Sequence, residues 1–342
     1  MEDCSEKLHI TNINTFQANA FYFLIFYKKN KKIPKFACFG QVHKVKGGVP
    51  LTIAALKPIF GNVLSVKQEK MNIYSWNVNG IRSAIKKGFE DWFNTQKPDI
   101  LCLQETRADE DQVPESLRNP EGYFAYWNPC RRKKGYSGVA VFSQIEPDAV
   151  NYGFDIEEFD EEGRVLQLVF PDWVLNSIYF PNGGSGDDRL DYKLRFYDAF
   201  LENSRRWLND GKHVVTLGDY NTCHKEIDIA RPKENEGISG FLPIERAWMD
   251  KYVENGFVDS FRLLHPDERD RYSWWSNRFG ARKRNVGWRI DYAFVDEGLV
   301  PNVVNAEIHA DVMGSDHCPI SIELEPPFAP LPIKPASPEG EV

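Results

Sequence analysis

The sequence predicts an α/β protein in which two β-sheets pack face to face and helices cover their outer sides. Short apolar runs, typical of strands, alternate with amphipathic runs, typical of helices, from Met71 to about Glu325. The chain has 342 residues, of which 42% are hydrophobic, so it can bury a large core. Many strands interleaved with surface helices are best accommodated by such a layered sandwich.

The expected elements follow from local patterns along the chain. Pro98 ends an amphipathic helix, and Pro171-Asp172 marks a hairpin between two strands. Asn255-Gly256 supplies a left-handed helix end. On this basis we predict strands over 73–76, 100–103, 138–142, 165–170, 174–180, 213–217, 289–295 and 319–324, and helices over 84–95, 187–208 and 245–254.

The two ends of the chain differ from its middle. Residues 1–70 hold eleven lysines, no arginine and four acidic residues, a balance of +7, and they lack any block with an evident chemical role. We expect them to be a non-catalytic N-terminal extension, or the product of a start assigned upstream of a true start at Met71, rather than a functional basic arm. Residues 71–325 would then form the folded domain, and the six prolines within 326–342 predict a disordered tail.

Composition narrows the class of protein. No segment reaches the ~18–20 apolar residues that a membrane span needs, and the most apolar stretch, residues 18–27, follows acidic residues instead of the basic start of a signal peptide. The six cysteines form no CxxC pair, which argues against a zinc site or a disulfide framework and favours a reducing, cytoplasmic compartment. From residue 71 onward the net charge is −15, so nonspecific coating of nucleic acid is not expected, although a local basic face can still bind phosphates.

Four short polar blocks stand at the ends of apolar runs, at residues 76–80, 103–105, 217–221 and 314–317. Functional sites are usually built on loops that a rigid sheet holds, so we expect the four blocks to converge. Glu105 is a hard oxygen ligand of the kind that Mg²⁺ prefers, and Asn77 could add an amide oxygen. The alternative for each block taken alone is a helix cap or an Asx turn.

Two of the blocks carry residues suited to the hydrolysis of a phosphodiester, which needs a metal, a base and an oxyanion donor. If the strand continues past residue 217, the side chains of Asp219 and Asn221 point the same way and can hold a water molecule. The imidazolium of His317, next to Asp316, could donate to a phosphate oxygen if Asp291 fixed its tautomer and raised its pKa. A structural role is the alternative for a single histidine.

Basic residues gather in two runs that also contain aromatic residues. We interpret both runs as phosphate contacts with nucleic acid, and the alternative for either run alone is a solvated surface. The first run is Arg131, Arg132, Lys133 and Lys134, followed by Tyr136, and the second is Arg278, Arg282, Lys283, Arg284 and Arg289, interleaved with Phe279 and Trp288.

Nine motifs stand in order along residues 71–325: SWNVNGIR at 75–82, LQET at 103–106, GYSG at 135–138, YFPNG at 179–183, GDYN at 218–221, ARPK at 230–233, SGFLP at 239–243, NVGWRIDY at 285–292 and SDHCP at 315–319. In these motifs residues 71–325 resemble the exonuclease III family of apurinic/apyrimidinic (AP) endonucleases. The resemblance implies the DNase I-like four-layer α/β/β/α sandwich and a DNA-repair hydrolase that cuts double-stranded DNA on the 5′ side of an abasic site. The products would be a 3′-hydroxyl and a 5′-deoxyribose phosphate, and the cofactor would be Mg²⁺, or Mn²⁺ in its place, with no organic cofactor.

The resemblance also implies a role for each matching residue. Glu105 would be the main metal ligand, Asp219 would orient and deprotonate the attacking water, and His317, oriented by Asp291, would stabilise the oxyanion. The other positions are Asn77, Asp219, Asn221, Asp316 and His317 at or near the metal, Tyr179 and Asn182 at the scissile phosphate, Tyr136, Arg278 and Arg284 on the DNA, and Trp274, Trp288 and Ile290 around the flipped abasic sugar. Asn79 stands where many members have Asp, and Ile290 where Leu is usual.

Several properties stay open at this level. The balance between AP endonuclease, 3′→5′ exonuclease and 3′-phosphatase activity depends on loops that the motifs do not fix. The motifs also leave open the number of metal ions. We expect a monomer associated with the nucleoid in the cytoplasm of a prokaryotic-type cell. One alternative is a related phosphodiesterase that acts on RNA or a phosphorylated small molecule. Another is a catalytically inactive DNA-binding module, which is disfavoured because every catalytic residue type is present.

Overall fold

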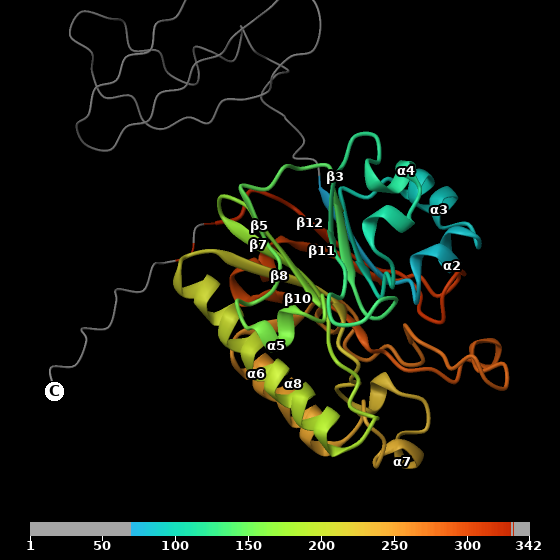
Figure 1. The fold of residues 1–342 in the computed structure, drawn as a ribbon. Coiled ribbons are helices and arrows are strands. Elements are labelled where there is room, and N and C mark those ends of the chain that lie inside the picture. Colours follow the sequence, from blue (N-terminus) through green and yellow to red (C-terminus); the bar gives the residue numbers. More distant parts are fainter. Residues whose placement is uncertain (1–69, 330, 332–342) are drawn as a thin grey trace, which may run out of the picture. The chain divides into compact units, whose positions relative to one another are not determined.

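The computed structural model describes residues 70–329 and 331, and Figure 1 shows how their elements are arranged. The predictions about the N-terminal extension, and about most of the C-terminal tail, lie outside the described residues. Within the described part of the chain, no helix has the length and apolar character that crossing a membrane would require.

Two six-stranded mixed sheets form the centre of the fold. The first consists of β1 (Met71–Asn77), β2 (Ile100–Gln104), β3 (Phe124–Asn128), β4 (Val139–Ser143), β11 (Val303–Ile308) and β12 (Ile320–Leu324), in the order β11-β12-β1-β2-β4-β3. The second consists of β5 (Ala149–Asn151), β6 (Val165–Val169), β7 (Trp173–Tyr179), β8 (His213–Asp219), β9 (Phe257–Asp259) and β10 (Asp291–Asp296), in the order β5-β6-β7-β8-β10-β9. The pairs β1–β2 and β7–β8 are parallel, whereas β8–β10 and β1–β12 are antiparallel.

The two sheets face each other across a shared apolar core. Because successive side chains of a strand point to opposite faces, alternate residues of each strand enter this core. Ile73 and Cys102 of the first sheet lie in the same buried cluster as Val215 and Leu217 of the second. Burial of apolar surface at about 25 cal/mol per Å² makes this interface a main source of stability.

Helices cover the two outer faces of the sandwich (Figure 1). On the first sheet, α3 (Phe89–Gln96) packs Phe89 and Phe93 against residues of β2 and β4. On the second sheet, α6 (Asp187–Asn209) and α8 (Pro243–Glu254) lie side by side and share a buried aromatic cluster with β7, β8 and β10. The predicted four layers, α/β/β/α, are therefore confirmed.

The helix predictions are confirmed except at one place. α6 and α8 match the helices expected over 187–208 and 245–254, and Gly256, at φ 88°, follows α8 in the expected left-handed conformation. The single helix expected over 84–95 is wrong, because the chain forms α2 (Ile81–Ile85), turns, and starts α3 after Gly88 at φ 96°. That conformation suits glycine and interrupts a continuous helix. The remaining α-helices of the described residues are α4 (Glu115–Arg118), α5 (Glu157–Asp160), α7 (Pro232–Asn235) and α9 (Ser260–Leu264).

The strand ends bring the polar blocks to one edge of the sandwich. Asn77 ends β1, Glu105 follows β2 directly, and Asp219 ends β8. Asp219 pairs in the antiparallel register with Asp291, the first residue of β10, and in the parallel register with Tyr179 of β7. Both sheets therefore contribute carboxylates to the same place.

Candidate active site

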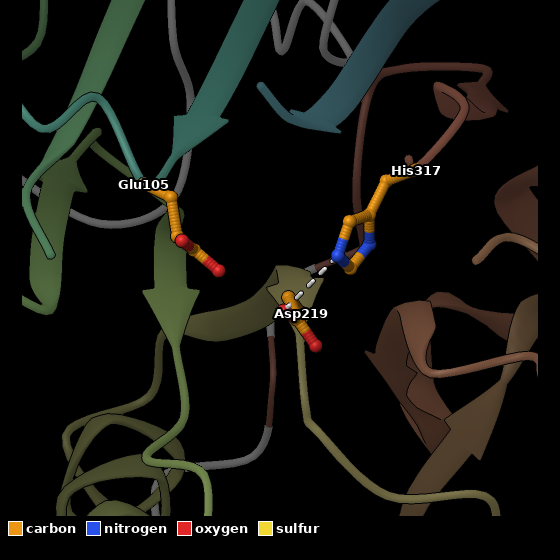
Figure 2. Close-up of side chains that lie close together, drawn as sticks. All are labelled: Glu105, Asp219 and His317. Atoms are coloured by element: carbon orange, nitrogen blue, oxygen red, sulfur yellow. Dashed lines mark ion pairs between the residues drawn. The ribbon is translucent and has the colours of Figure 1, made fainter. Parts of the chain in front are cut away.

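Three buried side chains from distant parts of the chain meet at this edge (Figure 2). Figure 2 shows Glu105, Asp219 and His317 turned toward one another, and one potential ligand atom of each lies within 4.8 Å of the others. All three are largely removed from water, with exposed fractions of 8%, 1% and 4%. Two carboxylates and an imidazole at this separation in a buried site create strong mutual electrostatic effects.

Asn77 links the two carboxylates. Its amide nitrogen donates to Oε1 of Glu105 at 3.0 Å and to Oδ2 of Asp219 at 2.8 Å. Its amide oxygen accepts the backbone N–H of Asn79 at 3.0 Å. In this arrangement Asn77 presents a donor, not an oxygen, to the carboxylates, so it orients both of them across the gap between the sheets.

Arg107 is a site neighbour that the sequence analysis missed. Its guanidinium forms a short ion pair with Oε2 of Glu105. Glu105 and Arg107 both have left-handed backbone conformations, at φ 51° and 50°, and these turn the two side chains toward each other. No local sequence pattern predicts that geometry, because most residue types avoid it.

Asp291 holds His317. Nδ1 of His317 lies 2.9 Å from Oδ2 of Asp291, and its other nitrogen, Nε2, lies 3.9 Å from Oδ2 of Asp219. Burial alone would lower the pKa of His317, but Asp291, Asp219 and Asp316 outweigh it and raise that pKa to about 10. At neutral pH the ring is therefore an imidazolium whose Nε2–H points into the site.

Asp219 has the properties of a general base. Burial raises the pKa of its carboxyl to about 7, with further increases from Asp291 and Glu105 and an opposing effect from His317. A base is most effective when its pKa is close to the working pH. The backbone N–H of Asn221 donates to Oδ1 of Asp219 at 2.7 Å and fixes the orientation of the carboxylate.

The donor set fits a hard divalent cation. Glu105 and Asp219 offer carboxylate oxygens, which Mg²⁺ and Mn²⁺ both accept. His317 belongs to the same cluster, but a protonated imidazole whose Nδ1 is paired with Asp291 offers no lone pair to a metal. The geometry thus favours His317 as a hydrogen-bond donor over its predicted second role as a ligand.

Asp316 lies apart from the Glu105–Asp219–His317 group. Its Oδ1 accepts from the amide of Asn79 at 2.8 Å, and its Oδ2 accepts from the indole of Trp274 at 3.2 Å. Burial opposes ionisation, but His317 and these two hydrogen bonds lower the pKa of the Asp316 carboxyl. The amide of Asn79 also has a clear function here, because an aspartate at this position would repel Asp316.

Asn221 and Asn182 are joined by a hydrogen bond next to Asp219. The amide nitrogen of Asn221 donates to the backbone oxygen of Phe180 at 2.9 Å and more weakly to Asp219 at 3.3 Å. Its amide oxygen accepts from Asn182 at 3.2 Å. Asn182 is exposed, so it is accessible to a ligand from outside.

Tyr179 is buried beside Glu105. Burial first, and then the Glu105 carboxylate, hold the pKa of the phenol well above its ordinary value. The guanidinium of Arg164 lies 4.5 Å above the Tyr179 ring. The phenol therefore stays protonated and can act as a hydrogen-bond donor.

A second missed network lies behind Tyr179 and reaches the predicted DNA contact Tyr136. The hydroxyl of Tyr136 accepts from Arg164 and from Arg189, both at 2.9 Å. Glu162 accepts from both arginines, at 2.6 and 2.8 Å. The available sequence signal was Glu162-Gly-Arg164 at the start of a buried strand, since charged residues are rarely buried without partners.

Two indole rings form a perpendicular pair next to His317. The rings of Trp274 and Trp288 lie 5.9 Å apart at 90°, and the Trp274 ring lies 6.4 Å from the imidazole. Ile290 is buried in the same cluster. Trp275, the residue after Trp274, is buried in the core between the sheets.

The second basic run divides into surface and structural residues. Arg278, Lys283 and Arg284 are exposed, and so are the four basic residues at 131–134. The interpretation of Arg289 as a phosphate contact is wrong, because it is 1% exposed and pairs with Asp228 and Asp259.

Arg282 also differs from the prediction. It is half-buried, and its guanidinium donates to the backbone oxygens of Ala310, Val312 and Ser315. Its guanidinium therefore holds the backbone of 310–315, just before the Asp316-His317 block, and is not free on the surface.

Comparison with known proteins identifies the family. The family model described as "Endonuclease/Exonuclease/phosphatase family" matches residues 74–317. The chain belongs to this family. It is 46% identical over 253 residues to an exodeoxyribonuclease of Bacillus subtilis. The alignment covers 74% of this chain and 98% of the relative. It is 43% identical over 255 residues to DNA repair nuclease APEX1 of Danio rerio. This alignment covers 74% of this chain and 82% of the relative.

A solved structure supports the same assignment. AP endonuclease LMAP from Leishmania major matches with a TM-score of 0.69 and 31% identity, over 75% of this chain and 88% of the other. The predicted DNase I-like fold and the resemblance to exonuclease III-type AP endonucleases are therefore confirmed, as is the assignment to DNA-repair nucleases. Members of this family depend on metal ions, and the buried acidic cluster could hold one.

Proposed function

We propose that this chain hydrolyses the phosphodiester bond on the 5′ side of an abasic site in duplex DNA, with Mg²⁺ as the cofactor and Mn²⁺ as a substitute. The observation that carries the proposal is the opposition of two groups in one buried site. The carboxylate of Asp219, held by the amide of Asn77 and the backbone N–H of Asn221, lies 3.9 Å from Nε2 of His317. A base and an oxyanion donor on either side of one small space suit the in-line attack of water on phosphorus.

Glu105 and Asp219 would hold the metal ion, which supplies neutralisation of the phosphate charge when bound. Asn77 keeps both carboxylates in a fixed relation, and Arg107 balances the charge of Glu105. Asp316 supports the site from behind by holding Asn79 and Trp274.

The chemical step uses groups of this chain at each stage. Asp219 accepts a proton from water as the water oxygen bonds to phosphorus, and Asn221 helps to orient that water. The bond between phosphorus and the 3′ oxygen of the preceding nucleotide breaks, and that oxygen takes up a proton from a water molecule, which leaves a 3′-hydroxyl and a 5′-deoxyribose phosphate. His317, held by Asp291, donates to a nonbridging oxygen as charge accumulates there, and Tyr179 and Asn182 contact the same phosphate.

Selectivity for an abasic site would come from the aromatic pocket. Trp274, Trp288 and Ile290 offer an apolar space beside His317 that suits a deoxyribose without its base. Tyr136, Arg278 and Arg284 would contact the DNA backbone, together with the exposed run at 131–134. A single chain supplies all of these groups, so we propose a monomer that acts on chromosomal DNA in the cytoplasm.

The test is a duplex that carries one tetrahydrofuran abasic analogue, incubated with Mg²⁺, with Mn²⁺ or with EDTA. We expect a nick on the 5′ side of the lesion with either metal ion and none with EDTA. A protein that leaves this duplex intact in Mg²⁺ would contradict the proposal.

A second activity, 3′→5′ exonuclease, is favoured by the similarity to an exodeoxyribonuclease. The same base and oxyanion donor can act on a terminal phosphodiester or on a 3′-phosphate. Matched duplexes with a recessed 3′-hydroxyl end, a 3′-phosphate end and an internal lesion would give the ratio of the three activities. An RNA or inositol phosphate substrate cut faster than all three would favour another branch of the family.

A further inference from the structure

A buried ion pair outside the catalytic group joins two loops that border the site. Lys193 of α6 and Glu245 of α8 are both 0% exposed, and Nζ of Lys193 lies 2.6 Å from Oε1 of Glu245. A buried ion pair is costly unless further hydrogen bonds satisfy both charges. The further hydrogen bonds of this pair go to the loop at 219–223 and the loop at 239–242.

Lys193 holds the loop that follows β8. Its Nζ donates at 2.8 Å to the backbone oxygen of Asn221. Asn221 has φ 51°, a left-handed conformation that is uncommon for non-glycine residues but that asparagine adopts more readily than most. The N–H of the same residue, which lies in the preceding peptide unit, donates to Oδ1 of Asp219, so the lysine holds the residue whose amide orients the base.

Glu245 holds the loop beside the aromatic pocket. Its Oε2 accepts the N–H of Gly240 at 2.5 Å and that of Leu242 at 3.0 Å, and its Oε1 accepts the hydroxyl of Ser239 at 2.9 Å. One carboxylate therefore organises the whole turn.

The two loops are also locked to each other. The N–H of Cys223 donates to the backbone oxygen of Gly240 at 2.7 Å. Gly240 has φ 97°, and a Cβ atom there would lie 3.0 Å from the Trp288 ring and 3.1 Å from the oxygen of Asn221. Gly240 therefore fits between Trp288, in the wall of the pocket, and Asn221, in the loop after β8, where a larger residue would be crowded.

We propose that Lys193 and Glu245 are positioning residues. They hold the loop at 219–223, which carries Asn221, and the loop at 239–242, which borders the sugar pocket, at a fixed separation. This inference rests on the proposed function for its effect on catalysis. Misplacement of a reacting group by ~1 Å can cost ~10²-fold in rate, so a pair that touches no substrate can still act on the chemical step.

Three variants separate positioning from simple stability. Lys193→Met leaves the Glu245 charge buried and unpaired, which we expect to destabilise the fold. Lys193→Met/Glu245→Gln removes both charges, and the new amide keeps an oxygen for the N–H groups of Gly240 and Leu242. Lys251→Met is the matched control, because it breaks an exposed 2.8 Å ion pair with Asp198 that joins the same two helices away from the site.

Kinetics on the tetrahydrofuran duplex in Mg²⁺ give the first readout. We expect kcat per folded molecule to fall ~10- to 100-fold in the single and the double Lys193 variants, with KM changed less than ~2-fold, and Lys251→Met to behave as wild type. Thermal unfolding should recover toward wild type in the double variant while kcat stays low. Recovery of kcat together with stability would overturn the proposal, since a structural pair predicts that result.

Hydrogen exchange of the free protein gives a readout that needs no activity. We expect faster exchange of the amides in 219–223 in the double variant, because the backbone oxygen of Asn221 loses its lysine, with unchanged protection in the centres of α6 and α8. Unchanged exchange in 219–223 would overturn the inference. A wild-type protein that fails to cut abasic DNA, combined with faster loop exchange in the variant, would refute the proposed function and leave the positioning role standing.

Discussion

Two buried aspartates of this protein ionise in opposite ways, although both are removed from water. Asp219 is 1% exposed and has a pKa raised to about 7, whereas Asp228 is 0% exposed and has a pKa lowered to about 2. Burial raises the pKa in both cases, so the neighbours decide the difference. The comparison separates a site built for chemistry from one built for stability.

The neighbours of the two carboxylates explain the contrast. Asp228 accepts from Arg289 at 2.8 Å and from Arg262 at 2.7 Å, and these two cations outweigh its burial. Asp219 accepts mainly neutral amide donors, and its nearest cation, His317, stands 3.9 Å away. Other carboxylates around Asp219 raise its pKa further, so its charge is held in an unfavourable setting.

The largest effect on stability is expected from Asp228→Asn. This change leaves the buried guanidinium of Arg289 and the partly buried guanidinium of Arg262 without their shared carboxylate, and we expect the free energy of unfolding to fall by about 3–5 kcal/mol. Urea unfolding of wild type and variant would measure the loss. The rate of cutting per folded molecule should stay near that of wild type, and a catalytic defect without a stability defect would reverse the roles assigned to the two aspartates.

The opposite result is expected from Asp219→Asn. The variant loses the proposed base, so single-turnover cutting of abasic DNA should slow by at least ~10²-fold. Its unfolding free energy in EDTA should equal or exceed that of wild type, because a charge in an unfavourable setting is gone. A near-normal rate would remove Asp219 from the role of base.

His317→Ala should also slow the chemical step by at least ~10²-fold, the scale of a lost oxyanion donor. His317→Gln offers a milder comparison, since an amide can still donate a hydrogen bond. Rates of the two variants on the same lesion duplex measure the difference. Equal and near-normal rates would show that the donor lies elsewhere.

The comparison also predicts two opposite pH dependences of stability in EDTA. The folded-state pKa of Asp228 lies below its unfolded value of about 3.9, so its contribution is present above that value and is lost as pH falls toward 2. The folded-state pKa of Asp219 lies above its unfolded value, so the folded state binds more protons between about 4 and 7, and stability declines as pH rises through that window.

Urea unfolding at a series of pH values would test both slopes. Asp219→Asn should remove the decline between pH 4 and 7 and leave the loss at acid pH unchanged. A decline that persists in this variant would assign the raised pKa to another group.

The smallest effect is expected from removing the N-terminal extension. A chain that begins at Met71 should unfold at the same urea concentration and cut abasic DNA at the same rate as the full chain, because residues 71–325 contain every group of the proposed site. Loss of either property would show that the extension belongs to the enzyme.

Much of the fold could be predicted because its strands are short apolar runs that end at polar blocks. The hairpin around Pro171 and the helix α6 both follow local rules. The break at Gly88 was missed, since the apolar spacing continues across it while the backbone does not. Arg289 was misjudged for a related reason, because a basic residue between aromatic residues looks the same whether it faces DNA or buried carboxylates.

By itself, the sequence determined the family, the places of the eight predicted strands and of α6 and α8, and the residue types available for catalysis, since motifs and periodicity are local properties. The tertiary structure decided what each side chain contacts. It turned Asp316 toward Asn79 and Trp274, placed Arg107 on Glu105 and joined Lys193 to the backbone of Asn221. It also gave two aspartates opposite charge preferences, because a pKa depends on burial and on neighbours that are distant in sequence.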